Sequence, residues 1–226
     1  MSDASTPVTA TSRFAAVRSR RAVMTFVGIT LAVLVADLVL KYVAFRTVAG
    51  RPVVVDVRDP SRIVEPGDPA RLPAEHDAVV VVPRLLSLKL TTNTGAVFGI
   101  GKGGKWFFVA VSVVAVGALG WFFARSDPRG WGLHVALGLT LAGALGNLYD
   151  RVRYNAVRDM LWMLPEVRLP WGLRWPGMGG GSGSDQVWPW IFNLADAALM
   201  VGVGMIVAIT WWHELRLRRG GETGRS

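Results

Sequence analysis

Carboxylate and amide side chains stand in or beside long apolar segments of this chain, where an ionisable group is costly unless it is paired or hydrated. Two such groups repeat the pattern Asn-x-x-Asp: Asn147 with Asp150, and Asn193 with Asp196. At this spacing the amide and the carboxylate share one face of a helix. Asn and Asp also favour helix ends, but that explanation fits Asn147 poorly because the sequence looks helical on both sides of it. Both pairs are therefore candidates for chemistry.

Asp159 lies just beyond the third apolar segment, at a place where a surface acid would be ordinary. If the third and fourth segments are antiparallel neighbours, Asp159 and Asp196 both fall at the same membrane interface. Two carboxylates close together share a proton, which leaves one as a base and the other as an acid. Such a pair can activate a water molecule and protonate a leaving amine.

Other chemistries have little support in the sequence. Asp37 and Lys41 are four residues apart on the first segment, and we interpret them as a structural ion pair on one helix face. The chain has no cysteine and only three scattered histidines, which excludes disulfides, thiol catalysis and a site of the HExxH type. We expect neither a metal nor a cofactor, so the carboxylates must carry any acid–base chemistry.

Composition places the chain in the membrane class. Hydrophobic residues make up 51% of it, and its net charge of +9 comes from arginines at the ends of apolar segments rather than from a basic stripe with aromatics. We expect membrane lipids and no nucleic acid as partners. The chain divides as follows: tail 1–21, span 22–45, loop 46–105, span 106–124, span 131–149, loop 150–189, span 190–212 and tail 213–226.

The expected fold is an all-α integral membrane protein with four transmembrane helices and a small extracytoplasmic β-rich subdomain between spans 1 and 2. Residues 53–55 and 86–90 are the expected strands. Basic residues at both tails and in the short middle loop predict that both termini are cytoplasmic, and tryptophans bracket the spans as interfacial anchors. The glycine run at 177–184 is interpreted as a flexible linker.

Five sequence blocks, taken together, resemble the signature of the lipoprotein signal peptidases (signal peptidase II). In order, they are Asp37-x-x-x-Lys41, Asn93-Thr-Gly-Ala-Val-Phe98, Gly146-Asn-Leu-Tyr-Asp-Arg151, Val157-Arg-Asp159 and Phe192-Asn-Leu-Ala-Asp196. Each block alone is a weak signal. Their order on a four-span framework makes the resemblance specific, and it covers all but the two tails and parts of the loops.

The resemblance implies an aspartic endopeptidase of the bacterial inner membrane. Its substrate would be a prolipoprotein, cut before a cysteine that carries a diacylglyceryl group, and its inhibitor the cyclic peptide globomycin. Asp159 and Asp196 match the catalytic pair near the outer face. The positions that match substrate-binding or supporting residues are Asp37, Lys41, Asn93, Gly95, Asn147, Asp150, Arg151 and Asn193. We expect the enzyme to be a monomer. Choosing Asp159 over Asp150 rests on the resemblance alone.

The chain also departs from the family pattern. Residues 155–156 replace the usual glycine before the first catalytic aspartate, and a Trp- and Gly-rich insert lengthens the distance from Asp159 to Asp196. Two other functions fit parts of the sequence. A small proton-coupled transporter would use the intramembrane carboxylates, but the sequence has no inverted repeat. A membrane scaffold would explain the small-residue stripe at Gly138, Ala142 and Gly146, but not the doubled Asn-x-x-Asp pattern.

Overall fold

The structure, a computed structural model, describes residues 15–95, 105–176 and 183–223. Several predictions fall outside the described residues. These are the expectations for residues 1–14 of the first tail, residues 96–98 of the Asn93 block and residues 177–182 of the glycine run.

Four helices among the described residues are long and apolar enough to cross a membrane: α2 (Arg20–Thr47), α3 (Lys105–Arg125), α4 (Trp131–Tyr154) and α5 (Leu194–Thr223). A short fifth helix, α1 (Ala15–Arg18), precedes them. Helix α2 begins at the side chain of Ser19, which accepts a hydrogen bond from the N–H of Ala22. Helix α4 runs on to Tyr154, and α5 begins only at Leu194 because a strand occupies the residues before it.

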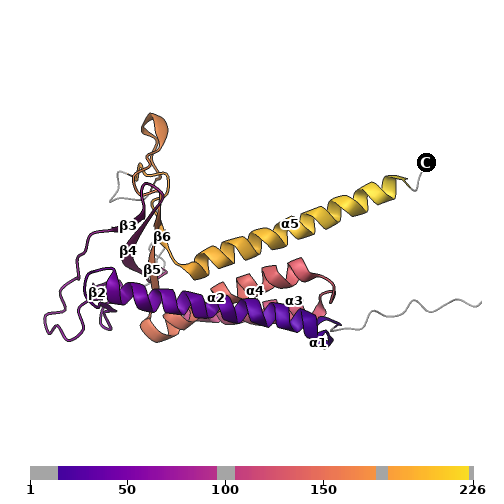
Figure 1. Ribbon diagram of the computed structural model, residues 1–226, viewed down its shortest axis with the longest axis horizontal. Helices are drawn as coiled ribbons and strands as arrows, with labels where there is room; N and C mark the ends of the chain where they lie inside the picture. The colour runs from indigo at the N-terminus through magenta and orange to yellow at the C-terminus, as the bar shows by residue number, and fades with distance from the viewer. Residues whose placement is uncertain (1–14, 96–104, 177–182, 224–226) are drawn as a thin grey trace, which may run out of the picture.

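Helix α4 is the centre of the bundle. It contacts each of the other three long helices, and 56% of its most apolar window is buried against 6 to 17% for the others. Small residues permit this close packing: a Cβ atom added at Gly138 would lie 3.0 Å from the carbonyl oxygen of Phe26 in α2. In Figure 1, α2, α3 and α4 run together while α5 splays away towards its C-terminal end.

Two antiparallel sheets lie at one end of the helices. The smaller pairs β1 (Val54–Val55) with β2 (Ile63–Val64). The larger has the order β3 (Val79–Val82), β4 (Leu86–Asn93), β5 (Val157–Met163) and β6 (Ile191–Phe192). A core of buried side chains, which includes Phe45, Leu90 and Met160, packs this subdomain onto the end of α2.

The β-rich subdomain differs from the sequence prediction in two ways. It is not confined to the loop between the first two spans, because β5 and β6 come from the loop between the last two. Residues 53–55 and 86–90 also fall in separate sheets rather than in one. Strand β5 was missed because its first four residues are all buried, so it lacks the alternating pattern that indicates a half-exposed strand.

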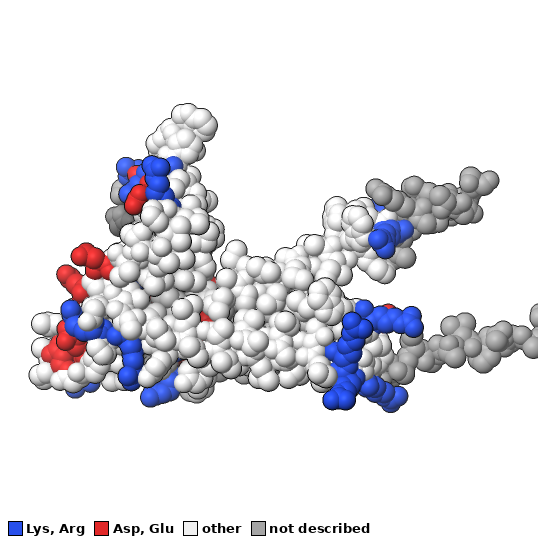
Figure 2. Space-filling model, in the orientation of Figure 1, with Lys and Arg blue, Asp and Glu red and all other residues white. Residues whose placement is uncertain are grey.

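Charge separates the two ends of the molecule. Figure 2 shows acidic and basic side chains together at the sheet end, an uncharged surface over most of the helices, and basic side chains at the opposite end. Exposed arginines of that opposite end include Arg18, Arg20, Arg21, Arg125, Arg129, Arg216 and Arg218. We refer to these as the sheet end and the basic end.

The insert between β5 and β6 forms an arm, defined here by its described residues 164–176 and 183–190. Its two sides pair as a hairpin through antiparallel bridges between Arg168 and Gln186 and between Trp175 and Ser184. A short 3-10 turn, Pro170–Gly172, lies on its first side. Over its described residues, the insert that the sequence predicts therefore folds as a hairpin.

Candidate active site

Both Asn-x-x-Asp patterns lie at the sheet end, on the facing helices α4 and α5. Asn147 and Asp150 stand on the buried face of α4, with 7% and 0% of their surfaces exposed. Asn193 and Asp196 open α5 as a reciprocal cap: the Asp196 N–H donates to Asn193 Oδ1 at 3.0 Å, and the Asn193 N–H donates to Asp196 Oδ2 at 3.1 Å. Helix capping therefore accounts for the second pattern but not for the first, which is inside a helix.

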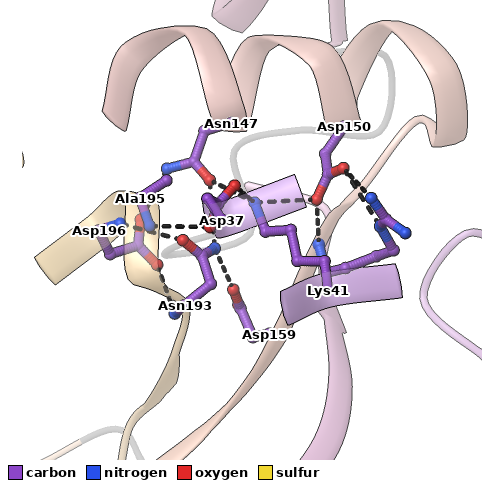
Figure 3. Close-up of polar contacts among 9 residues, drawn as sticks. Asp37, Lys41, Asn147, Asp150, Asp159, Asn193, Ala195 and Asp196 are labelled. Carbon is purple, nitrogen blue, oxygen red and sulfur yellow. Dashed lines mark hydrogen bonds and ion pairs between the residues drawn. The ribbon is translucent and has the colours of Figure 1, made fainter. Parts of the chain in front are cut away.

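The Asn193 side chain connects the two candidate catalytic carboxylates (Figure 3). Its Nδ2 group donates to Asp159 Oδ1 at 2.6 Å and to Asn147 Oδ1 at 3.1 Å. Asn147 in turn donates through Nδ2 to Asp196 Oδ1 at 2.7 Å. Asp159 on β5 and Asp196 on α5 therefore belong to one hydrogen-bonded cluster, as the antiparallel arrangement of the third and fourth spans requires.

Lys41 is the positive centre of the buried polar cluster. Its Nζ atom lies 2.8 Å from Asp37 Oδ2, which confirms the predicted ion pair, and 3.2 Å from Asp150 Oδ2. Asp37 also accepts the N–H of Ala195 at 2.9 Å, so the first span holds the first turn of α5 in place. The absence of a side chain at Gly146 makes this possible, since an added Cβ would lie 2.6 Å from Asp37 Oδ2.

Both carboxylate oxygens of Asp150 lie against cations. Besides Lys41, the Arg158 side chain binds its Oδ1 atom at 2.8 Å through Nη2 and 3.2 Å through Nε, and the Arg158 N–H donates to Oδ2 at 3.0 Å. Donors therefore occupy both oxygens of Asp150, which leaves neither of them free for a substrate. This geometry favours Asp159 over Asp150 as the reactive acid of this region, a choice that the sequence alone left to the family resemblance.

Asp159 has the electrostatics of a proton donor. Only 2% of its surface is exposed, and its one hydrogen bond comes from an amide rather than from a cation. Burial, together with the nearby charge of Asp196, raises the pKa of Asp159 from 3.8 to about 7, although the Asn193 hydrogen bond opposes part of this shift. Asp196 is half-buried and accepts two N–H donors, one on each oxygen. The two carboxylates therefore differ in environment.

Comparison with known proteins agrees with this geometry. The family described as signal peptidase (SPase) II matches residues 29–212 of the chain. The chain belongs to the signal peptidase II family. It is 35% identical over 133 residues to the lipoprotein signal peptidase of Symbiobacterium thermophilum, covering 59% of the chain and 75% of that protein. It is also 35% identical over 144 residues to the lipoprotein signal peptidase of Syntrophotalea carbinolica, covering 62% and 78%.

A solved structure of a bacterial membrane enzyme has the same fold. It is 27% identical to the chain, with a TM-score of 0.58, and the match covers 82% of this chain and 92% of the other. Membership of the signal peptidase II family makes the chain a protease that removes signal peptides from prolipoproteins. The transporter and scaffold alternatives lose their basis with this assignment.

Three of the residues that match family positions stand outside the hydrogen-bonded cluster. Asn93 is exposed at the end of β4, opposite Val157, and its side chain accepts the Gly95 N–H at 2.8 Å. Arg151 on α4 lies over the Phe108 ring, 5.3 Å from its centroid. The same ring lies beneath Gly95, where an added Cβ would come within 2.6 Å of it. Phe108, which the sequence did not single out, thus joins the Asn93 turn to α4.

The turn between α4 and β5 explains a departure from the signal peptidase II pattern. Asn155 ends α4 in the left-handed conformation, with φ of 60°, and its N–H donates to Arg151 O at 3.2 Å. Glycine favours this conformation, and asparagine tolerates it better than most residues do. Asn155 therefore makes the reversal that aims Asp159 back at the bundle, within the region 155–156 where the family resemblance led us to expect glycine.

Sequence reasoning missed Arg158. An arginine beside an aspartate at a helix end reads as surface charge, yet only 6% of Arg158 is exposed. Its partner Asp150 lies on a different element, and no local sequence pattern predicts that contact. Among the described residues no group of three or more His, Cys, Asp or Glu side chains could hold a metal ion.

Proposed function

We propose that this signal peptidase II cuts diacylglyceryl-modified prolipoproteins just before the lipidated cysteine, with Asp159 as general acid and Asp196 as general base. The observation that carries the proposal is the Asn193 and Asn147 cluster, which links one buried carboxyl group of raised pKa to a second carboxylate with two N–H donors. The same fold with two equivalent, solvated aspartates would not separate an acid from a base.

The chemistry needs neither a covalent intermediate nor a metal in this scheme. Asp196 removes a proton from water as the water oxygen attacks the scissile carbonyl carbon, while Asp159 donates its proton to the carbonyl oxygen. The resulting tetrahedral diol collapses as its C–N bond breaks. The leaving amine takes the proton held by Asp196, and a diol hydroxyl returns a proton to Asp159, which restores the starting state.

The remaining polar residues hold this pair and its substrate in the proposal. Asn147 and Asn193 orient the two carboxylates, and the ion pairs of Lys41 with Asp37 and Asp150 tie together the elements that carry them. Asn93 and Arg151, at the margin of the cluster, bind the peptide backbone or its carbonyl groups. The lipid chains of the substrate lie between the spans.

The proposed location is the bacterial inner membrane, with the sheet end outside and both termini in the cytoplasm. Exposed arginines predominate at the basic end in Figure 2, where Asp127 is an exposed acid, and positive residues in short loops are retained on the cytoplasmic side. The cluster of Asp159 and Asp196 then lies near the outer face. We propose a monomeric enzyme that requires no cofactor.

Cleavage of a synthetic diacylglyceryl prolipoprotein, followed by gel shift, tests the assignment. Asp159→Asn and Asp196→Asn should each reduce the cleavage rate at least roughly a hundredfold, in line with the loss of a general acid or base. Asp185→Asn is the matched control, because the Asp185 side chain is exposed and forms a surface ion pair with Arg168. Globomycin should block the wild-type reaction. Near-normal cleavage by either active-site variant would refute the pair.

A further inference from the structure

The arm between β5 and β6 carries large apolar side chains that keep much of their surface exposed. Trp171 is 91% exposed and Leu173 is 55% exposed, and Trp175 and Trp190 keep more than a third of their surfaces open. An indole left in water loses the free energy that burial would give it. The described residues leave Trp171 and Leu173, which we call the tip of the arm, exposed, so the tip calls for a further apolar surface.

The arm is held rigidly, so this exposure is built into the fold. Its sides are paired by hydrogen bonds from Val187 N–H to Val167 O at 2.9 Å and from Trp175 N–H to Ser184 O at 2.8 Å. At its base, Trp188 and Trp190 stack edge to face, with centroids 5.3 Å apart. Trp171 itself has φ of 55°, a left-handed conformation that is unfavourable for a bulky residue. The hairpin thus presents its indole outwards at a conformational cost.

The direction of the arm indicates what covers it. Figure 1 shows the arm rising sideways from the bundle, level with the sheet-end termini of α4 and α5 and roughly perpendicular to the helices. Because the helices cross the bilayer, this direction runs along the membrane surface instead of away from it. In Figure 2 the top of the arm is uncharged, while blue and red side chains lie lower on it.

We propose that the arm lies in the lipid headgroup layer of the sheet-end leaflet, with Trp171 and Leu173 inserted towards the acyl chains. Tryptophan suits this layer because its ring is apolar and its N–H is polar. The bilayer supplies the apolar surface that the tip lacks, and the arm becomes a lateral support for β5 and β6, which carry Asp159 and lead into Asn193. The inference needs only the four membrane helices and not the proposed chemistry.

A spin label measures this depth directly. The chain has no cysteine, so Trp171→Cys and Leu72→Cys each create a unique labelling site. Leu72 is the matched control: it is 66% exposed and lies between β2 and β3, in a segment that extends beyond the end of α2 in Figure 1. The full chain, reconstituted in lipid nanodiscs, is examined with oxygen and with a water-soluble nickel complex as relaxing agents.

The spin label at position 171 should collide with oxygen several times more often than with the nickel complex, as measured by its relaxation. The label at position 72 should show the reverse preference. Preferred contact with nickel at 171 would overturn the proposal. So would protection from both agents, because that result means that protein covers the tip. A second labelled site, Leu173→Cys, makes the test independent of position 171. Adding Trp171→Glu should make this label more accessible to nickel and less accessible to oxygen. Adding Val57→Glu instead should leave its accessibility unchanged.

Discussion

At the level of single residues, the difference between Asp159 and Asp150 decides the chemistry. Both are almost fully buried, but Asp150 has two cations within 3.2 Å whereas Asp159 accepts a hydrogen bond from the Asn193 amide. Burial therefore opposes ionisation of Asp159, whereas Lys41 and Arg158 form ion pairs with Asp150. Spacing in the sequence cannot distinguish them, because the decisive partner, Arg158, is adjacent to Asp159 in the chain but bonds to Asp150.

Asp159→Asn should stabilise the protein while abolishing cleavage. The raised pKa of Asp159 means that the unfolded chain ionises first, so stability falls as pH rises from about 4 to about 7 and stays reduced above that. Asparagine keeps an oxygen for the Asn193 bond and carries no charge. We expect the melting temperature of the variant to exceed that of the wild type by roughly 5 °C at pH 8, and by clearly less at pH 5.

Thermal melts in detergent at the two pH values measure this difference, with Asp185→Asn as an exposed control that should melt like the wild type at both. A gain that is equal at pH 5 and pH 8 would show that the ionised form of Asp159 is not destabilising. Asp196→Asn should behave differently, because the wild-type carboxylate accepts one donor on each oxygen and the amide can accept on only one.

Lys41→Met should destabilise the protein strongly. The substitution removes the cation 2.8 Å from Asp37 and 3.2 Å from Asp150 and leaves both carboxylates buried. Breaking a buried pair in this way costs about 3–5 kcal/mol, which corresponds to a fall in melting temperature of roughly 10 °C. Lys89→Met is the matched control, because Lys89 is exposed and lies over the Trp162 ring. Equal melting temperatures for the two variants would contradict the central role of Lys41.

At the level of elements, the site depends on two junctions: the turn from α4 into β5 and the entry from β6 into α5. The first holds Asp159 and the second holds Asn193 and Asp196. Strands β5 and β6 pair directly, with Leu161 opposite Phe192, so the two junctions are held together by the sheet. The helices could be predicted from apolar length, but this strand pairing joins two ends of one loop and leaves no periodic signal in the sequence.

Asn155 tests the first junction. Its side chain is exposed and its backbone has the left-handed conformation. Substitutions there therefore change the backbone preference but have little effect on packing. Asn155→Gly should be close to neutral, whereas Asn155→Val should cost about 1–2 kcal/mol and lower the cleavage rate, because a β-branched residue resists this conformation and displaces β5. Melting temperature and the gel-shift rate report the two effects. Arg153→Val, within the last turn of α4, is the control that should retain its rate.

At the level of the whole molecule, the sequence predicts the four helices and the polar residues that meet at the sheet end, because both depend on patterns within a segment. Asn147 and Asn193 were found in this way, and the structure joins them by a hydrogen bond of 3.1 Å. The sequence does not predict the four-stranded sheet, the burial of Arg158 or the direction of the arm. Each of these depends on contacts between segments far apart in the chain.

The orientation of the whole molecule can be tested with the same cysteine-free background. Leu72→Cys at the sheet end should react with a membrane-impermeant maleimide in intact spheroplasts, whereas Arg129→Cys at the basic end should react only after permeabilisation. The physical reason is the retention of arginines on the cytoplasmic side, which in the proposed topology puts the sheet end and the Asp159 cluster outside. Labelling of Arg129→Cys in intact spheroplasts would show that the topology is the reverse of the proposed one. In that case the carboxylate pair would lie on the cytoplasmic side, contrary to the proposed location.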